Sequence, residues 1–291
     1  MDRISIAIIF CCYNRIEKTK KCLESLLTDY NKNKYKIHLF ICDDLSTDGT
    51  YEYLKQNYSD QTIFQSKGNL FWCKSMNAAM SIAAKEYFDF YLMINDDVVF
   101  KENVLDELIN TYKQTEGDCS VTGVTVSSKD ESITYGGSCY KHRKLLGFDL
   151  CYNNKWFVQP DATRLVECDL SNWNCFLVPR SIIDSVGIID GKYQHGYGDF
   201  DFSLRMQKAG KKQYITQHNI GYCENNLLNG TYFDASTRRI VRIKKMFDKK
   251  HMPIYSHYRF HWRNFGVIGV LQVTWSYIKN IYKILRKSDI A

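Results

Sequence analysis

The stretch "FYLMINDDVVF", residues 90–100, places Asn95, Asp96 and Asp97 in the middle of an otherwise apolar run. An unpaired buried charge costs several kcal/mol, so such a cluster usually lies at the end of a strand and faces a positive group. That group can be a metal ion, a basic side chain or the N-terminus of a helix. The stretch therefore predicts a buried strand that leads into a polar site.

Strand and helix patterns alternate on the N-terminal side of this stretch. Apolar runs predict strands over residues 4–12, 36–44, 62–66 and 88–96, and helical spacing predicts a helix over 69–87. This alternation is typical of a parallel sheet with helices on both faces, in which ligands bind beyond the carboxyl ends of the strands. Polar clusters follow three of these strands, at residues 11–14, 43–44 and 95–97, which indicates one shared site.

The pattern changes beyond residue 118, where shorter strands and hairpins are predicted. A helix is predicted over 198–210, with Asp199 and Asp201 in its first turn and Gly210 as its stop. We expect this part to continue the same domain and to form the other wall of the cleft.

The composition is that of a globular protein, with 291 residues, 45% hydrophobic and 24% charged. The N-terminal residues predict a first strand and not a signal peptide, and no apolar run is long enough to predict a transmembrane helix. Eleven cysteines without a C-x-x-C pair predict core thiols in a reducing cytosol, and neither disulfides nor a zinc site.

The positive charge is concentrated near the C-terminus. Residues 238–287 contain thirteen Lys or Arg and one acidic residue, Asp248, so the formal charge of this segment is +12. The formal charge of the whole chain is +7, so the remaining residues together carry −5. Such asymmetry predicts a separate functional region.

Five motifs in this order resemble family 2 glycosyltransferases of the GT-A fold. They are "IIFCCYNR" (8–15), "ICDDLSTDGT" (41–50), "GNLFWCKSMNAAM" (68–80), "MINDDV" (93–98) and "GYGDFDFSLRMQKAG" (196–210). The resemblance implies a Rossmann-like, mostly parallel α/β sheet. It also implies transfer of a sugar, with inversion, from a nucleotide-diphosphate donor to an acceptor hydroxyl, in bacterial surface polysaccharide or lipid-linked glycan synthesis.

The resemblance also implies roles for the residues of the donor site. Asp97 would hold a divalent cation, Mg²⁺ or Mn²⁺, with Asn95 and Asp96 beside the ribose and phosphates, and Asp44 would accept a hydrogen bond from the base or ribose. The remaining residues of the predicted nucleotide-sugar site are Cys11, Tyr13, Asn14, Asn69 and Asn77. Structural alternatives stay open: Asp96 and Asp97 as caps of the helix after Asn103, Asp44 in an Asx-turn within residues 43–50, Cys11 and Tyr13 in strand-end packing, and Asn77 at the surface. Both interpretations of the loop can hold together, with Asp43 or Asp48 shaping it while Asp44 contacts the base.

On the acceptor side, the resemblance makes Asp199 the general base and Trp173 a sugar-stacking wall. Asp201 is the rival base, and simple helix capping is the alternative for Asp199. His218 is a weaker candidate for the metal shell than for a structural role. Two positions depart from the family pattern, because Asn95 replaces an aspartate of the metal motif and Gly198 replaces the glutamate before the base.

A helical stripe is predicted within residues 266–287. Its apolar members are Val267, Leu271, Trp275, Ile278, Tyr282 and Leu285, and Lys279, Lys283 and Arg286 lie on the other side of the helix. The pattern over 255–287 predicts a helix in a membrane interface, and a helix packed on the domain or in a homodimer is the alternative. No nucleic-acid module is present, so nucleic acid is not an expected partner.

The expected organisation is a catalytic domain over 1–235 and a basic helical extension over 236–291. Residues 1–100 would form its nucleotide-sugar half and 101–235 its acceptor half. The expected location is the cytoplasm, peripheral on the inner face of the cell membrane. A sugar-nucleotide pyrophosphorylase or a dehydrogenase would need a glycine-rich first loop, which "CCYNRIEK" lacks. A degenerate, membrane-associated subunit remains an alternative because of Asn95 and Gly198.

Overall fold

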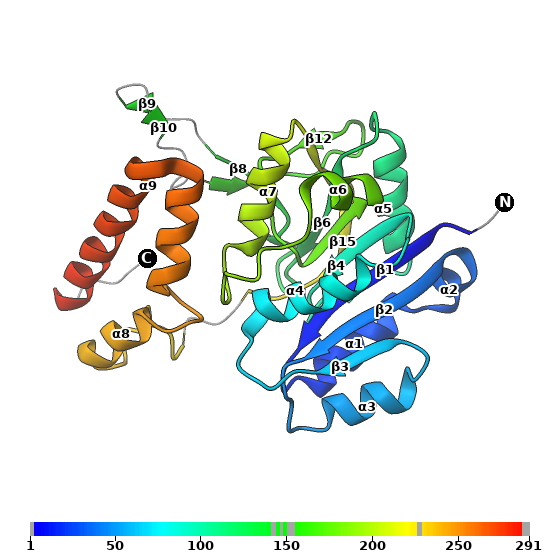
Figure 1. Ribbon diagram of the computed structural model, residues 1–291, viewed down its shortest axis with the longest axis horizontal. Helices are drawn as coiled ribbons and strands as arrows, with labels where there is room; N and C mark the ends of the chain where they lie inside the picture. Colours follow the sequence, from blue (N-terminus) through cyan, green and yellow to red (C-terminus); the bar gives the residue numbers. More distant parts are fainter. Residues whose placement is uncertain (1–2, 141–143, 146–147, 150–154, 226–228, 287–291) are drawn as a thin grey trace.

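The computed structural model describes residues 3–140, 144–145, 148–149, 155–225 and 229–286. Its centre is a ten-stranded sheet with the order β12-β15-β6-β14-β4-β1-β2-β3, to which β5 and β7 add at β15 and β6 (Figure 1). The strands of this sheet are β1 (Ser5–Cys12), β2 (Lys36–Asp43), β3 (Thr62–Gln65), β4 (Phe90–Ile94), β5 (Val99–Phe100), β6 (Ser120–Val126), β7 (Ile133–Tyr135), β12 (Val166–Glu167), β14 (Cys175–Pro179) and β15 (Gln213–Tyr222). Smaller sheets contain β8 (Gly137–Tyr140), β9 (Lys144–Leu145), β10 (Phe148–Asp149), β11 (Lys155–Phe157) and β13 (Leu170–Ser171).

The N-terminal half has the predicted parallel arrangement. β4, β1, β2 and β3 are neighbours and run parallel, so the carboxyl ends of these strands meet at one edge. β14 joins β4 and β6 in the antiparallel direction, and β15 returns parallel to β6 with two register shifts. The sheet is therefore mixed overall, with its parallel part where the apolar runs of the sequence predict it.

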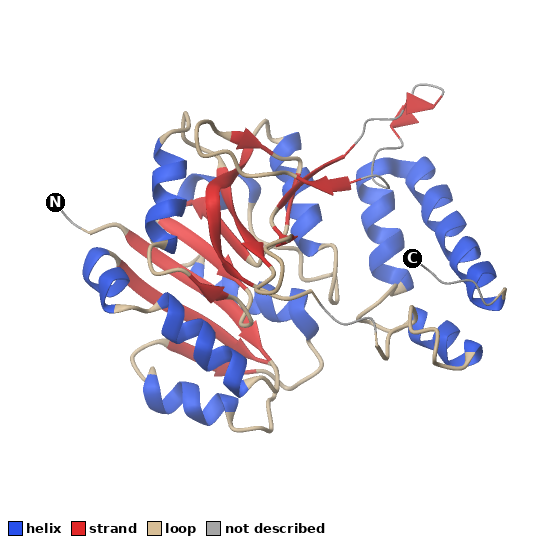
Figure 2. Cartoon of the chain, turned by 180° about the vertical axis from the view of Figure 1, so that it is seen from behind, coloured by secondary structure: helices blue, strands red, loops and turns tan. Residues whose placement is uncertain are grey.

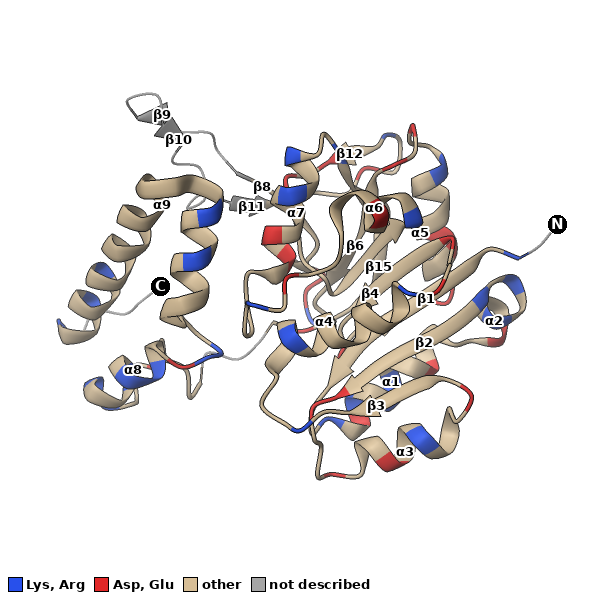
Figure 3. Ribbon diagram, viewed as in Figure 1, with Lys and Arg blue, Asp and Glu red and all other residues tan. Residues whose placement is uncertain are grey.

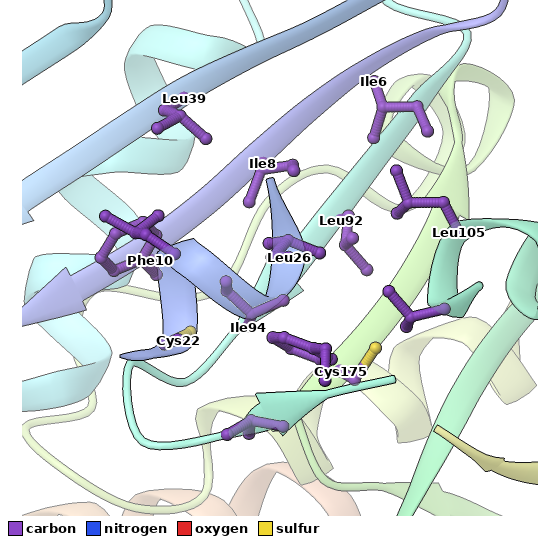
Figure 4. Close-up of a cluster of buried hydrophobic side chains, with 14 of the residues drawn as sticks. Ile6, Ile8, Phe10, Cys22, Leu26, Leu39, Leu92, Ile94, Leu105 and Cys175 are labelled. Carbon is purple, nitrogen blue, oxygen red and sulfur yellow. The ribbon is translucent and has the colours of Figure 1, made fainter. Parts of the chain in front are cut away.

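Helices cover both faces of the sheet, as expected (Figure 2). Those of the main body are α1 (Ile16–Leu26), α2 (Asp29–Lys34), α3 (Thr50–Asn57), α4 (Phe71–Ala83), α5 (Val104–Lys113), α6 (Arg180–Val186) and α7 (Gly198–Lys208). Alternate residues of β1 point to opposite faces: Ile8 and Phe10 pack with α1 and α5, whereas Ala7 and Ile9 pack with α4 and α7. Figure 4 shows the first of these two cores.

The C-terminal part consists of α8 (Arg239–Met246) and α9 (Ile254–Leu285), which lie together beside the main body (Figure 1). Gly266 has φ +58° and ψ −145° and interrupts α9, so the helix has a first limb, residues 254–265, and a second limb, residues 267–285. Phe260 of the first limb is fully buried in the same core as α4 and α7. The second limb instead packs with α8 in a core of its own, through Val273 and Tyr277.

No helix in the described part of the chain combines the length and the hydropathy that crossing a membrane requires. The ten cysteines within the described ranges all carry free thiols.

Candidate functional site

A cavity of about 590 Å³ lies at the carboxyl ends of the parallel strands. Its walls contain most of the predicted site residues, namely Cys11, Tyr13, Asp44, Asn69, Asn95, Asp96, Asp97, Trp173 and Asp199. They come from the ends of β1, β2 and β4, the start of α4, the turn before β14 and the first turn of α7. Segments that are far apart in the sequence therefore meet in one place, as strand topology predicts.

Asp96 and Asp97 face a basic side chain. Arg15, from the turn before α1, donates Nη1 to Asp96 Oδ1 at 3.3 Å and to Asp97 Oδ2 at 3.2 Å. The Thr19 hydroxyl donates to the other Asp96 oxygen at 3.0 Å, and Lys18 Nζ lies 3.7 Å from Asp97. Asp96 is 3% exposed, and its burial raises its pKa to about 6 although the Arg15 charge opposes that shift. Both carboxylates are thus held beside the cavity by an arginine that the motif comparison did not single out.

Asn95 has a partner of its own. Its Oδ1 accepts a hydrogen bond from the Trp72 indole Nε1 at 2.8 Å, and its backbone N–H donates to the Asn174 carbonyl at 3.2 Å. The amide at this position therefore fixes Trp72 in the cavity wall.

Asp44 ties the end of β2 to the start of α4. Its Oδ1 accepts from the Leu70 N–H at 3.1 Å and the Ser66 hydroxyl at 2.6 Å, and its Oδ2 accepts from the Phe71 N–H at 2.9 Å. A carboxylate is favourable at the N-terminus of a helix, where backbone N–H groups lack partners. Asp44 thus shapes the loop that carries Asn69 to the cavity.

Asp43 and Asp48 fix the turn between β2 and α3. Asp43 Oδ1 accepts from the Ser46 N–H at 2.8 Å, and Asp48 Oδ1 accepts from the Thr50 N–H at 3.1 Å. These two aspartates have the loop-shaping role that the sequence left open for them.

Two residues of the predicted donor site lie outside the cavity wall. Asn14 has φ +50° and accepts from the Thr47 N–H at 2.7 Å, so its side chain fastens the turn after β1 to the loop after β2. Asn77 Nδ2 donates to the Ile189 carbonyl at 2.6 Å, which joins α4 to the segment before α7. Tyr13 and Cys11 do line the cavity, and burial raises the pKa of the Cys11 thiol well above its usual range.

Asp199 and Asp201 have different surroundings. Asp199 lines the cavity, and its Oδ1 accepts from the N–H of the next residue at 2.9 Å. Asp201 is fully buried away from the cavity, where it accepts from Arg205 Nε at 3.0 Å and from the Tyr193 hydroxyl at 2.9 Å. Asp199 is therefore the carboxylate of α7 that can meet a ligand in the cavity.

Gly198, which stands where the family pattern has a glutamate, has no room for a side chain unless its neighbours move. A Cβ at this position would lie 2.4 Å from Cys73 Sγ and 2.7 Å from Ile189 Cδ1. The space that a glutamate would need is filled by neighbours from α4 and from the segment before α7.

Trp173 is mainly a core residue. It is 1% exposed, it stacks on Phe176 with centroids 5.2 Å apart, and it meets Phe202 edge-on at 5.1 Å. It also lines the cavity, and a sugar-stacking role for it stays a prediction. His218 is outside the cavity, where its Nδ1 lies 3.3 Å from Glu107 Oε2.

The cavity wall also contains residues that were not predicted as site residues, among them His195 and Lys250. His195 lies four residues before Asp199, and burial, with smaller contributions from Lys250 and Arg15, lowers its pKa to about 4. Lys250 comes from the segment between α8 and α9. The "QH" that directly precedes the last motif could have indicated His195, whereas no local pattern distinguishes Lys250 within the basic segment.

Asp96 and Asp97 are the carboxylates of the cavity whose fit to a metal ion matters for the expected cofactor. Within the described ranges no cluster of three or more His, Cys, Asp or Glu side chains could hold a metal by itself. Mg²⁺ commonly binds through one or two carboxylates and completes its shell with substrate phosphates and water. Asp96 and Asp97 fit that kind of site, provided that a phosphate ligand contributes and Arg15 releases Asp97.

The comparison with known sequences identifies the family. The profile described as "Glycosyl transferase family 2" matches residues 7–185, which is more than half of the chain. The chain belongs to glycosyl transferase family 2. Among curated proteins, EpsE of Bacillus subtilis (strain 168), which is named as a glycosyltransferase, is 35% identical to this family member over 86 residues. That match covers 28% of the chain and only 30% of EpsE.

Solved glycosyltransferase structures share the fold of this family 2 member. The mannosyltransferase PcManGT from Pyrobaculum calidifontis, in complex with GDP-Man and Mn²⁺, superposes with a TM-score of 0.55 at 10% identity and covers 98% of this chain and 73% of its own. S. aureus TarS 1-349 in complex with UDP has a TM-score of 0.51 at 13% identity and covers 98% and 81%. At these identities the likeness shows the fold alone, which confirms the GT-A architecture expected from the motifs.

Proposed function

We propose that this protein transfers a sugar from a nucleotide-diphosphate donor to an acceptor hydroxyl, with inversion at the anomeric carbon. The observation that carries the proposal is the convergence of Asp44, Asp96, Asp97 and Asp199 on one cavity, with Asp201 withdrawn into the core. TarS was also solved with UDP-GlcNAc and PcManGT with GDP-Man, which supports a nucleotide sugar as the donor class.

Asp199 would act as the general base. A carboxylate in the first turn of a helix is favoured in its ionised form, because the N-terminal end carries a partial positive charge. It can therefore accept the proton of the acceptor hydroxyl as that oxygen attacks the anomeric carbon. A single displacement of this kind inverts the anomeric configuration.

Asp97, with Asp96, would hold a divalent cation, Mg²⁺ or Mn²⁺, together with the donor diphosphate. Such an ion, when bound, acts as a Lewis acid that stabilises the charge on the leaving diphosphate. The chain's own part is to release Arg15 from Asp97, to orient Asp96 through Thr19 and Arg15, and to keep the diphosphate beside α4. The Mn²⁺ in the PcManGT complex supports this choice of cofactor.

The direct test is a panel of nucleotide sugars with and without Mg²⁺ or Mn²⁺, in which release of the nucleoside diphosphate is measured. We expect metal-dependent release with at least one donor, and loss of the metal-dependent part in Asp97→Ala. If thermal unfolding shows no stabilisation by any nucleotide sugar and no diphosphate is released, the degenerate-subunit alternative is correct instead.

The acceptor that we propose is a glycan or a lipid-linked glycan, reached by a protein bound peripherally to the inner face of a membrane. The second limb of α9 supports this, because its predicted apolar stripe is exposed, with Leu271 at 61% and Trp275 at 65%. Lys279 and Arg286 are exposed as well, and α9 contains no acidic residue (Figure 3). Two copies that met through this stripe would bring like charges together, whereas an anionic membrane complements them. The first limb is packed on the main body, so the membrane-facing part is shorter than 255–287.

Sedimentation with anionic phosphatidylglycerol vesicles and with neutral phosphatidylcholine vesicles tests the membrane proposal. The double variant Leu271→Glu/Trp275→Glu should lose binding to anionic vesicles, whereas Tyr87→Glu, which changes an exposed aromatic residue of the main body, should keep it. Intact protein that ignores anionic vesicles at low salt contradicts the proposal. A stable dimer that the double variant dissociates would assign the stripe to a second copy.

A further inference from the structure

The charged residues of the cavity are unequally paired. Its wall contains the carboxylates of Asp44, Asp96, Asp97 and Asp199 and the cations of Arg15 and Lys250. Arg15 is engaged by Asp96 and Asp97. No carboxylate of the described residues lies within ion-pair distance of Lys250. Lys250 is thus a cation of the cavity wall that is not held in an ion pair with a described residue.

The segment around Lys250 is held from two sides. On the side of the C-terminal part, Phe247 stacks on Tyr277 with centroids 5.6 Å apart, and the Tyr277 hydroxyl donates to the Met252 carbonyl at 2.7 Å. On the cavity side, Lys249 Nζ lies 4.9 Å from the centre of the Phe71 ring, which itself lines the cavity. The backbone that carries Lys250 is therefore fixed between the C-terminal core and the start of α4.

We propose that Lys250 binds a phosphate oxygen of the donor diphosphate and makes the C-terminal part of the chain a component of the donor site. The proposal rests on the proposed function, since it names the ligand of the same cavity. Four carboxylates and a dianionic ligand carry more negative charge than a divalent cation and Arg15 offset, and Lys250, which lines the same cavity, supplies a further positive charge. The family profile ends at residue 185, so this contribution lies outside the matched region.

The proposal predicts that Lys250 contributes to the binding of the phosphate groups of the ligand and not to that of its nucleoside. An ammonium group that meets phosphate oxygens contributes to the binding of a nucleoside diphosphate, less to a monophosphate and nothing to a nucleoside. Its contribution should also weaken with salt, because Lys250 is exposed to solvent. If binding depended only on the net positive charge of this region, removal of any of its lysines would weaken binding to the same extent.

Titration calorimetry with two ligand series provides the test: UDP, UMP and uridine, and GDP, GMP and guanosine, each with Mg²⁺. Lys250→Ala should weaken binding of the preferred diphosphate by about 10-fold, as expected for a lost charge-assisted hydrogen bond, and should leave nucleoside binding within about 2-fold. Lys244→Ala is the matched control, because Lys244 is an exposed lysine of α8 that does not line the cavity. Lys250→Arg should restore most of the affinity.

The outcomes separate the two proposals. If the unmodified protein binds neither these nucleotides nor any nucleotide sugar of the donor panel, the proposed function fails and the role of Lys250 fails with it. If it binds a diphosphate and Lys250→Ala binds that ligand equally well, the role of Lys250 alone is overturned. Equal weakening by Lys244→Ala also overturns it, since the effect would then come from net charge. Thermal unfolding of each variant confirms that the loss is not due to misfolding.

Discussion

Asp199 and Asp201 lie two residues apart in the first turn of α7, and their neighbours give them different tasks. Asp199 borders the cavity, whereas Asp201 accepts hydrogen bonds from Arg205 and Tyr193 and lies 3.4 Å from Arg263 Nη1. Side-chain direction on a helix explains the difference, because residues two apart do not share a face. Residue identity in the motif could not have shown which of the two is engaged.

Replacing each aspartate by asparagine should therefore give opposite results. Asp199→Asn keeps the shape and removes the basicity, so turnover should fall by about 100-fold or more while donor affinity is retained. Asp201→Asn leaves Arg205 without its buried partner and should lower the free energy of unfolding by about 3 kcal/mol. Steady-state kinetics and urea unfolding of both variants measure these effects. Full activity in Asp199→Asn, with a specific loss of turnover in a stably folded Asp201→Asn, would reverse the assignment.

At the scale of the element, the sequence pattern predicts a single C-terminal helix, whereas α9 consists of two limbs that meet at Gly266. The kink at Gly266 has a φ of +58°, which a glycine adopts without the strain that other residues meet. Gly269 lies close to the first limb, since a Cβ there would be 2.5 Å from the His261 carbonyl oxygen. The first limb buries His257 between Tyr197 and Tyr277, with ring centroids 4.6 and 5.7 Å away.

The buried His257 should make stability depend on pH. Burial lowers its pKa to about 3, so the unfolded chain binds a proton below its usual pKa of 6.5 while the folded chain does not. Stability should then fall as the pH decreases from 6.5 toward 3, by about 2 kcal/mol for one such imidazole between about pH 7 and pH 5. Urea unfolding at those two pH values checks this. His257→Leu should show a smaller difference than the unmodified protein, and an identical difference would exclude the contribution of His257.

Strands and helices were predicted well where a single pattern dominates. The apolar runs gave β1 and β2 to within about one residue, because strands covered on both faces need continuous apolar side chains. β15 was not predicted, since Gln217, His218 and Asn219 interrupt its apolar character where the pairing with β6 shifts register. Asn14 and Asn77 show the same limit at the site: the motif gives their position, but the neighbouring carbonyl and N–H groups decide where their side chains point.

At the scale of the whole molecule, the packing of the first limb of α9 determines how much the C-terminal part contributes to the free energy of unfolding. Arg259 Nη2 lies 2.6 Å and Arg263 Nη1 2.9 Å from Asp190 Oδ2, and Phe260 fills the core beside α7. The expected boundary between a domain over 1–235 and an extension over 236–291 therefore does not coincide with a break in this core. The C-terminal part also supplies Lys250 to the cavity.

Two truncations should consequently behave differently. A chain that ends after residue 250 loses Phe260 and both arginine partners of Asp190, and removal of a buried aromatic side chain alone costs about 3–5 kcal/mol, so it should fail to fold cooperatively. A chain that ends after residue 266 keeps these contacts and should retain a cooperative thermal transition while no longer binding anionic vesicles. Differential scanning calorimetry and vesicle sedimentation make the comparison. A stable, cooperative fold in the shorter chain would show that the first limb is dispensable.

The tight contact of Gly198 with Cys73 and Ile189 also bears on how this chain can evolve. A glutamate cannot enter position 198 without displacing a neighbour, because its Cβ would lie 2.4 Å from Cys73 Sγ. A smaller residue at 73 would make room for it, but on its own would leave a gap beside Gly198. We therefore expect substitutions at positions 73, 189 and 198 to be coupled by epistasis, because the backbone before Asp199 packs against a sulfur atom of the neighbouring helix α4.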